Sequence, residues 1–473
     1  MSDFDHAAEP LLARRDVLRV GAVTAAGSLV PTAWSAQARA TIAAGRAESV
    51  IFLWMGGGVT HIDSLDPKPL APEQIRGTLS AIDTSLPGVR FSEVCPELAK
   101  LAHELCVVRS FSHDSNDHLL SQVYTLSGRK VTAAQLFSEP NIGAVISYLL
   151  GPRHNLPGYI AVPGITRPGP PPHNLFVGGW LGNQHAPFCV GGRPDQPDFT
   201  VGKREINPSP VCVENLNPRE LAFPRELTVG RLSRRAMLKH DLDGAARTAE
   251  VAARSGPVSQ GFEDAMQLLT SPAVHDAFDL SRETESLRDR YGRTKIGGRC
   301  LLARRLVEAG ARFVMVDYGY DPDYGNLWDI HNVPEQKFPH VSEMCRRGYS
   351  VAGIDRAFAA LIADLKERGR LDSTLVVYLT EFGRTPQINS LGGRDHWGAC
   401  GSMFFTGAGV RCGQVIGQSD EQAAYPTTPP YSPADVAATI YAALGLDAES
   451  RIPDRENRPH PLLDHGAPIP GVL

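Results

Sequence analysis

Four short, almost continuously apolar runs constrain the fold of this chain more than any other feature. They occupy residues 49–55, 105–109, 312–317 and 375–379. Runs of this length and composition are typical of strands that are buried on both faces of a sheet. Helical patterns at 299–309 and 354–368 lead into the third and fourth runs, the second of them with apolar side chains on one face. This alternation predicts an α/β fold in which a mostly parallel sheet carries helices on both faces.

The composition is that of a large globular protein. The chain has 473 residues, of which 42% are hydrophobic and 21% charged, and its formal net charge is −5. No long basic run lies beyond the N-terminus, so nucleic acid is not an expected partner. No apolar stretch after residue 40 reaches the roughly 20 residues that cross a bilayer. The eight cysteines form no CxxC pair, which argues against a zinc ribbon, and Cys400 could pair with Cys412 across a hairpin.

The first 40 residues have the features of an export signal. Arg14 and Arg15 precede a weakly apolar run at 20–30, and alanines with Ala-x-Ala spacing follow at 36–40. This arrangement is typical of a twin-arginine signal peptide and predicts a periplasmic or secreted protein. The alternative is an amphipathic helix of the mature domain, and the Gly and Thr content and the absence of acidic residues after Asp16 argue against it.

The remaining residues, 41–473, are expected to form a single domain. Pro and Gly cluster near 152–225, where no periodicity survives, so we expect an irregular insertion across the sheet edge or over the site. The last large helix is expected at 433–444, with Ser432 as its N-cap and Pro433 at its first position.

Side chains that suit metal ligation or acid–base chemistry follow the predicted strands. In an open parallel sheet, ligands bind at the carboxyl ends of the strands, where these loops meet. Five loops carry such groups, namely His61, Asp63 and Asp66; His113, Asp114, Asp117 and His118; Asp329 and His331; Glu381; and Asp395 and His396. A single loop of this kind would mean little, but convergence of five predicts a site.

Three of these loops carry motifs that resemble one protein family. They read Trp-Asp-x-His around Asp329, Glu-Phe-Gly-Arg-Thr-Pro from Glu381, and Gly-Arg-Asp-His-Trp around His396. With the twin-arginine start, they resemble the exported family known as domain of unknown function 1501, within the alkaline phosphatase–sulfatase superfamily. The resemblance covers roughly residues 48–151 and 295–470 and implies the fold of that superfamily.

The resemblance also implies roles for individual residues. Asp63 matches the opening metal ligand of the superfamily, and the loop with His396 matches the one that brings a third histidine. Segment 117–130 aligns with the sulfatase helix that carries the nucleophile and ends Thr-Gly-Arg.

Positions in two segments depart from the superfamily pattern. The Pro and Arg of the sulfatase motif are replaced by Leu120 and Gln122. Counting back from Gly128 and Arg129, the nucleophile position falls on His118 rather than on Ser, Thr or Cys. The pair expected at a second metal is Glu381-Phe382, and Phe cannot ligate. The chain therefore keeps ligands for one metal and half of a second.

These observations predict a candidate site. The candidate metal ligands are His61, Asp63, Asp329, His331, Glu381 and His396, and the candidate catalytic residues are His118 and Arg129. A mixed carboxylate and imidazole set predicts a divalent metal ion, with Zn²⁺, Mn²⁺ and Fe²⁺ all suitable and Ca²⁺ not excluded.

Each assignment has an ordinary alternative. Asp329 and His331 could be a turn residue and a surface histidine, and Glu381 could simply pair with Arg384. Arg109, Arg129 and Arg384 could clamp an oxyanion, although salt bridges are the commoner fate of arginine. His118 could bind substrate, ligate metal or act as nucleophile or acid; ligation or binding is preferred because histidine nucleophiles are rare. Asp395 is a candidate for holding the second ring nitrogen of His396.

Two functions remain open on this basis. The first is a metal-dependent hydrolase of phosphate or sulfate esters outside the cytoplasm, acting on a small anionic ester or on a sulfated or phosphorylated glycan. The second is a non-catalytic exported protein, for binding or surface assembly, that keeps the fold and a partial metal site.

Overall fold

The computed structural model describes residues 46–164, 175–191, 265–321, 324–332 and 338–473, with a few isolated positions between 216 and 234. The predicted signal peptide at 1–40 lies outside these residues. Among the described helices, none is both long and apolar enough to span a membrane.

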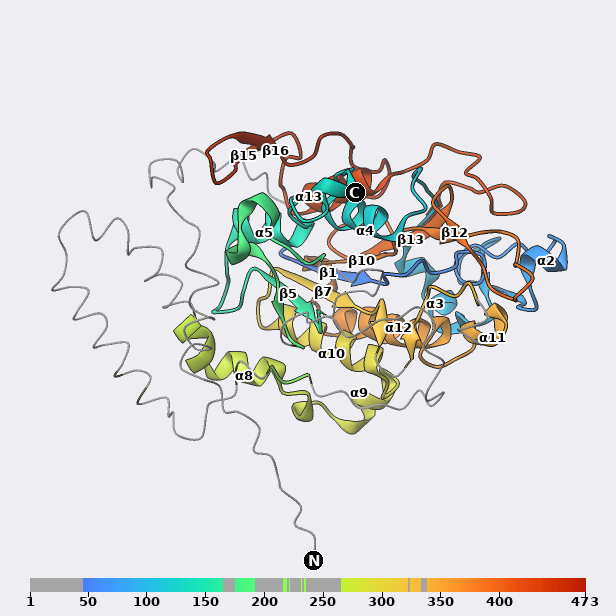
Figure 1. The fold of residues 1–473 in the computed structure, drawn as a ribbon. Coiled ribbons are helices and arrows are strands. Elements are labelled where there is room, and N and C mark those ends of the chain that lie inside the picture. The colour runs from blue at the N-terminus through green and yellow to red at the C-terminus, as the bar shows by residue number, and fades with distance from the viewer. Residues whose placement is uncertain are drawn as a thin grey trace, which may run out of the picture.

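An eight-stranded sheet forms the centre of the molecule (Figure 1). Its strand order is β14-β4-β13-β10-β1-β7-β5-β6. In chain order, the strands are β1 (Ser49–Trp54), β4 (Cys106–Phe111), β5 (Tyr159–Val162), β6 (Phe188–Cys189), β7 (Phe313–Asp317), β10 (Thr374–Leu379), β13 (Gly401–Thr406) and β14 (Gln414–Ile416). In this sheet β13 runs antiparallel to both of its neighbours and the other pairs are parallel, which confirms the predicted mostly parallel sheet.

The central strand β1 explains why its sequence is apolar without interruption. Ile51 and Leu53 point into one hydrophobic cluster, whereas Phe52 and Trp54 point into the other. Successive strand residues face opposite sides of a sheet, so a strand covered on both sides needs an apolar residue at every position.

Helices cover both faces of the sheet (Figure 1). One face carries α3 (Pro96–Lys100), α10 (Lys295–Glu308) and α12 (Val351–Glu367), and the other carries α4 (His118–Ser127), α5 (Ile142–Leu150) and α13 (Pro433–Ala443). The other described α-helices are α2 (Glu73–Arg76), α8 (Pro272–Phe278), α9 (Glu285–Arg290) and α11 (Val341–Cys345). The prediction of helices on both faces is therefore confirmed.

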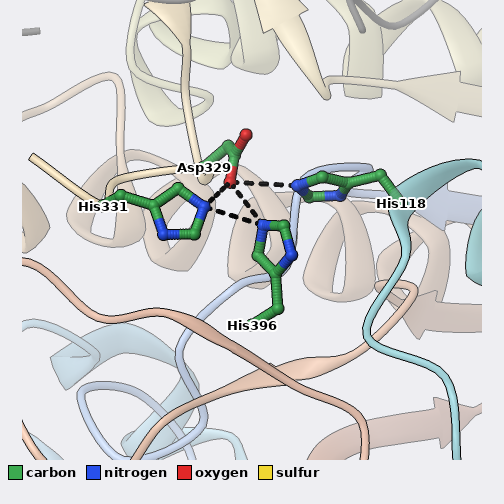
Figure 2. Close-up of side chains that lie close together, drawn as sticks. All are labelled: His118, Asp329, His331 and His396. Atoms are coloured by element: carbon green, nitrogen blue, oxygen red, sulfur yellow. Dashed lines mark hydrogen bonds and ion pairs between the residues drawn. The ribbon is translucent and has the colours of Figure 1, made fainter. Parts of the chain in front are cut away.

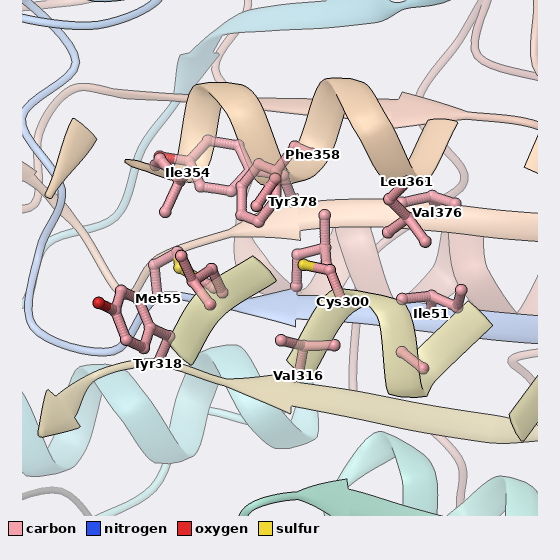
Figure 3. Packing of buried hydrophobic residues seen from close by; sticks show 14 of the residues in the cluster. Ile51, Met55, Cys300, Val316, Tyr318, Ile354, Phe358, Leu361, Val376 and Tyr378 are labelled. Atoms are coloured by element: carbon pink, nitrogen blue, oxygen red, sulfur yellow. The ribbon is translucent and has the colours of Figure 1, made fainter. Parts of the chain in front are cut away.

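Helix α12 shows how one helical face makes this packing. Figure 3 shows Ile354, Phe358 and Leu361 pointing from α12 onto the sheet, where Val376 and Tyr378 of β10 meet them. The rings of Phe358 and Tyr378 lie 5.7 Å apart. Full burial of each such side chain contributes about 1.5–3 kcal/mol, so this stripe anchors the helix that leads into β10.

Four further pairs of short strands lie outside the main sheet. They are β2 (Ala81–Asp83) with β3 (Arg90–Ser92), β8 (Tyr320–Asp321) with β9 (Gly325–Asn326), β11 (Gly383–Arg384) with β12 (His396–Trp397), and β15 (Arg451–Pro453) with β16 (Pro459–Pro461). The β11–β12 pair matters most for the site, because it brings the loop after β10 against the loop before β13.

Several local predictions can be compared with the structure. Ser432 caps α13, its hydroxyl accepting from the amide of Asp435, and Pro433 is the first helical residue, as predicted. The segment near 152–225 was expected to be irregular, yet it supplies β5 and β6 to the sheet. Only four residues long, β5 is too short to show a pattern in sequence. The described cysteines, Cys400 and Cys412 among them, are free thiols, so the suggested hairpin disulfide is not formed.

Candidate metal centre

Loops from distant parts of the chain bring four side chains together at the carboxyl ends of the parallel strands. His118 is the first residue of α4, which follows β4. Asp329 and His331 lie in the segment that follows β7, and His396 opens β12, which pairs with β11 just after β10. This is the edge at which an open α/β sheet binds ligands.

The group is centred on one oxygen atom (Figure 2). The Nε2 atoms of His118, His331 and His396 each lie 3.0 Å from Asp329 Oδ1. His331 Nε2 and His396 Nε2 are 2.8 Å apart. One ligand atom from each of the four residues lies within 4.8 Å of the others, so the group could hold a metal ion.

On the side of each ring that faces away from Asp329, an oxygen atom determines that Nδ1 carries a hydrogen. Every Nδ1 atom faces an oxygen at 2.8 Å, which is Glu381 Oε1 for His118, Asp395 Oδ1 for His331 and the main-chain oxygen of Asn116 for His396. Carboxylate and carbonyl oxygens are acceptors, so each Nδ1 donates a hydrogen. A neutral ring then presents a lone pair at Nε2, towards the carboxylate of Asp329.

This arrangement fits a metal ion. When the rings are neutral, three lone pairs face a carboxylate oxygen at about hydrogen-bond distance, and a positive charge among them would stabilise this arrangement. Nitrogen and oxygen donors of this kind bind Zn²⁺ and other divalent transition metals. If a divalent ion is bound here, Asp329, His118, His331 and His396 would hold it.

The charges in direct contact with the rings also favour a cation. Asp329, Glu381 and Asp395 bring three carboxylates, whereas Arg384 brings one guanidinium, with Nη2 2.9 Å from Asp329 Oδ1. The formal charges of these four groups sum to −2 when the histidines are neutral. A divalent ion would bring that sum to zero.

The pKa values reflect the same charges. Burial alone would raise the pKa of Asp329, but the charges of His118 and Arg384 outweigh it and hold the pKa well below its usual value. Burial lowers the pKa of His331, but the hydrogen bond and charge of Asp329 outweigh it and raise that pKa above its usual value. For His396, burial dominates and the pKa is lowered. Asp329 is thus held as a carboxylate, ready to bind a cation.

The structure does not bring Asp63 into this group, although we predicted it as a ligand. Its two carboxylate oxygens accept from Arg394, at 2.7 Å from Nε and 3.1 Å from Nη2. Thr60 donates to Oδ2 at 2.7 Å. Arg394 comes from the same Gly-Arg-Asp-His-Trp loop as His396, so one loop supplies a ligand candidate to one site and a counter-ion to the other.

His61 also lies apart from the group. It is 1% exposed, its Nε2 lies 2.8 Å from the main-chain oxygen of Ala423, and its Nδ1 has no hydrogen-bond partner. Burial lowers its pKa. Its surroundings are those of a neutral core histidine.

The two remaining candidates, Glu381 and Arg129, also lie outside the group of four side chains. Glu381, predicted as a ligand, lies behind His118 and contacts its Nδ1. Arg129, predicted as catalytic, pairs with Glu139 and Asp464, both at 2.8 Å, and its contacts include no member of the group. Arg129 follows the end of α4 and donates to Pro461 and Asp464 of the C-terminal segment.

Sequence reasoning missed some of the partners. Asp395 was expected to hold the second nitrogen of His396 and holds that of His331 instead. Gln122 was noted only as a departure from the sulfatase motif, yet its Nε2 donates to Glu381 Oε1 at 2.9 Å. Its position four residues after His118, on the same face of α4, was a signal that could have revealed it.

The fold and the site together define a class: an α/β protein with a histidine and aspartate cluster at the carboxyl edge of a mostly parallel sheet. Residues 47–473 match the family described as protein of unknown function (DUF1501), and the chain belongs to this family. A search of curated proteins gave no match.

Some solved structures align with the chain at low similarity. Ps i-CgsB aligns with a TM-score of 0.39 and 14% identity, over 85% of this chain and 72% of that one. A protein in the alkaline phosphatase superfamily from Vibrio parahaemolyticus gives 0.37 and 11%, over 93% and 77%. The phosphonate monoester hydrolase SpPMH from Silicibacter pomeroyi gives 0.36 and 12%, over 84% and 73%.

Proposed function

We propose that this protein is a metal-dependent hydrolase of phosphate or sulfate esters that acts outside the cytoplasm. The observation that carries the proposal is the convergence of three Nε2 atoms on Asp329 Oδ1, each with its Nδ1 held by an acceptor. A divalent metal bound there would polarise an ester oxygen and lower the pKa of a water molecule. The substrate would be a small anionic ester or a sulfated or phosphorylated glycan.

The residues around the site support direct attack by water. His118 stands where the superfamily resemblance places the nucleophile, and its two nitrogens face Glu381 and Asp329. Ser121, the nearest serine in the same helix, directs its hydroxyl to Ser115 Oγ at 2.9 Å. The nucleophile position thus carries an imidazole in place of a hydroxyl or thiol, and direct attack by water needs no covalent step.

Metal analysis combined with an activity panel tests the proposal. Wild-type protein should hold about one Zn²⁺, Mn²⁺ or Fe²⁺ per chain and hydrolyse at least one of p-nitrophenyl phosphate, bis-p-nitrophenyl phosphate and p-nitrophenyl sulfate. His331→Ala should lose both properties. His103→Ala is the matched control, because His103 is exposed and contacts Ser85 rather than the group. Hydrolysis that survives complete removal of metal would refute the proposal.

A second candidate function is supported by the arginines. Arg109 donates to the main-chain oxygens of Leu65 and Arg90, and Arg384 to Asp329. Together with Arg129, every arginine that we considered as an oxyanion clamp already contacts groups of the protein, Arg384 within the candidate metal centre itself. This favours an exported binding or surface-assembly protein that keeps a partial metal site. Metal-loaded protein that binds sulfated glycan but cleaves no ester in the panel would support this candidate over the hydrolase.

The location outside the cytoplasm follows from the predicted twin-arginine signal. Replacing Arg14 and Arg15 together with Lys should leave uncleaved protein in the cytoplasm, because the paired arginine is the feature that the export route reads. Cell fractionation with an antibody to the C-terminus measures this. Normal processing of the double variant would rule out the route.

A further inference from the structure

Glu381 is a buried carboxylate surrounded by N–H donors. It follows β10 after Thr380 and is fully buried. The amide of Gly57 lies 2.8 Å from Oε1 and 2.7 Å from Oε2, and the amide of Gly58 lies 3.1 Å from Oε2. Gln122 Nε2 donates to Oε1 at 2.9 Å. Because these neighbours can only donate, Glu381 is an acceptor at both of its oxygens.

The glycines after β1 make this arrangement possible. Gly57 and Gly58 have φ angles of +132° and +79°, which L side chains rarely adopt. A Cβ on Gly58 would lie 2.6 Å from the ring of Phe382 and 2.9 Å from Arg384 Nε. Only a chain without side chains at this turn can direct two successive amides at one carboxylate.

The consequence for His118 is a defined orientation and a defined tautomer. Its Nδ1 lies 2.8 Å from Glu381 Oε1 and therefore donates. Its ring also packs on Phe382, with centroids 4.9 Å apart. The Nε2 atom is then left to face Asp329 Oδ1 at 3.0 Å.

The same contacts leave few ligand atoms for a second metal ion. Glu381 and Phe382 occupy the place where the superfamily resemblance implies second-metal ligands. Both oxygens of Glu381 are taken by donors, and the ring of Phe382 packs against His118 and against His396, at 4.8 Å from the latter. The carboxylate that would bind a second ion instead lies behind a ligand candidate of the first.

We propose that Glu381 is a positioning residue: it holds His118 with Nδ1 protonated, and so makes His118 Nε2 a donor atom of a centre that takes one divalent ion per chain. The inference rests on the metal part of the proposed function and not on hydrolysis. Outer-shell partners of this kind typically change metal affinity by about 10–100-fold.

A double-mutant cycle on Zn²⁺ affinity tests the proposal. Glu381→Gln should weaken Zn²⁺ binding by about 10–100-fold, because it replaces one acceptor oxygen by an NH₂ donor, which must then face either the Nδ1 hydrogen of His118 or the amides of Gly57 and Gly58. His118→Ala should also weaken it. If Glu381 acts through His118, Glu381→Gln should cause no further loss on the His118→Ala background. An equal loss on both backgrounds would show a merely structural role and overturn the proposal.

A competing chelator dye measures the affinity, and thermal unfolding of the metal-free variants confirms that each is folded. Gln122→Met is the matched control: it removes another donor from the same oxygen of Glu381 but leaves His118 in contact, so its effect on Zn²⁺ affinity should be much smaller than that of Glu381→Gln. Binding of two Zn²⁺ ions per wild-type chain, or of none, would also overturn the proposal. Intact coupling in a protein that cleaves no ester would refute the hydrolase and leave this inference standing.

Discussion

Asp63 and Asp329 are two buried aspartates that follow strands of the same sheet, yet they have different surroundings. Asp63 meets a guanidinium that binds both of its oxygens, whereas one oxygen of Asp329 meets three imidazoles and a single nitrogen of Arg384. Arginine cannot give up its charge, so the first pair is complete in itself. Neutral imidazoles with Nδ1 protonated present their Nε2 lone pairs to the carboxylate, and a bound cation would stabilise that arrangement. Two loops with the same spacing, His-x-Asp and Asp-x-His, thus give an ion pair and a candidate metal centre.

The two aspartates should differ most in their effect on metal binding, which is measured after each carboxylate is removed in turn. Asp329→Asn should lower Zn²⁺ affinity by at least about 100-fold, since it removes the only anionic oxygen among the four ligand candidates. Asp63→Asn should retain wild-type affinity in the folded fraction. Equal losses of metal from the two variants would show that Asp63 belongs to the site after all.

The free energy of unfolding should depend more on Asp63 than on Asp329, which is the opposite of the order for metal affinity. Asp63→Asn leaves Arg394 buried, 1% exposed, without its counter-ion. Loss of one partner of a buried pair costs about 3–5 kcal/mol, so the free energy of unfolding in urea should fall by about that amount. Asp83→Asn is the control, because Asp83 and Arg90 form an exposed pair whose loss should cost less than about 1 kcal/mol. An Asp63→Asn variant as stable as this control would contradict the interpretation.

Histidines near the two aspartates should give opposite pH dependences in the metal-free protein. The pKa of His61 is lowered by burial, so its contribution to stability is full above pH 6.5 and is lost as the pH falls below that value. The pKa of His331 is raised, because Asp329 outweighs the burial of the ring. Its contribution is full below pH 6.5 and is lost as the pH rises through the raised pKa.

Unfolding measured from pH 5 to 8 checks these signs. His61→Asn should flatten the stability profile below pH 6.5, and His331→Asn should flatten it above pH 6.5. Profiles that change on the same side of that pH in both variants would contradict the assigned environments.

The smallest effect is expected from the serine nearest the superfamily nucleophile position. Ser121→Ala removes a hydroxyl that contacts Ser115 and no member of the metal group. Ester hydrolysis at constant metal content should therefore be unchanged, and kcat of the loaded enzyme measures this. A large fall in kcat, with metal content unchanged, would place the nucleophile at Ser121 and exclude direct attack by water.

Much of the fold could be predicted because the sheet is covered on both sides. A strand such as β1 must be apolar at every position, and that requirement is visible as an unbroken apolar run. The strands that were missed lack this signal. β5 has only four residues. β13 begins Gly-Ser and follows a polar loop, and its antiparallel direction depends on neighbours far away in sequence.

The candidate site was predictable in part. Asp329, His331 and His396 were found because strand-end loops converge in this architecture. The exclusion of Asp63 was not predictable, since it depends on Arg394, 331 residues away in the chain. The role of Glu381 likewise depends on amides of Gly57 and Gly58, 324 and 323 residues away.

The sequence by itself therefore determined which residues could act: the apolar period assigned strands and helices, and strand-end motifs collected the titratable groups at one edge. Only the tertiary structure decided which partner each group received. Asp63 contacts a guanidinium, Glu381 accepts from two main-chain amides, and Asp329 contacts three imidazoles. The physical reason is that charge and hydrogen bonding are satisfied between side chains that meet only after folding, whereas burial leaves its pattern along the chain itself.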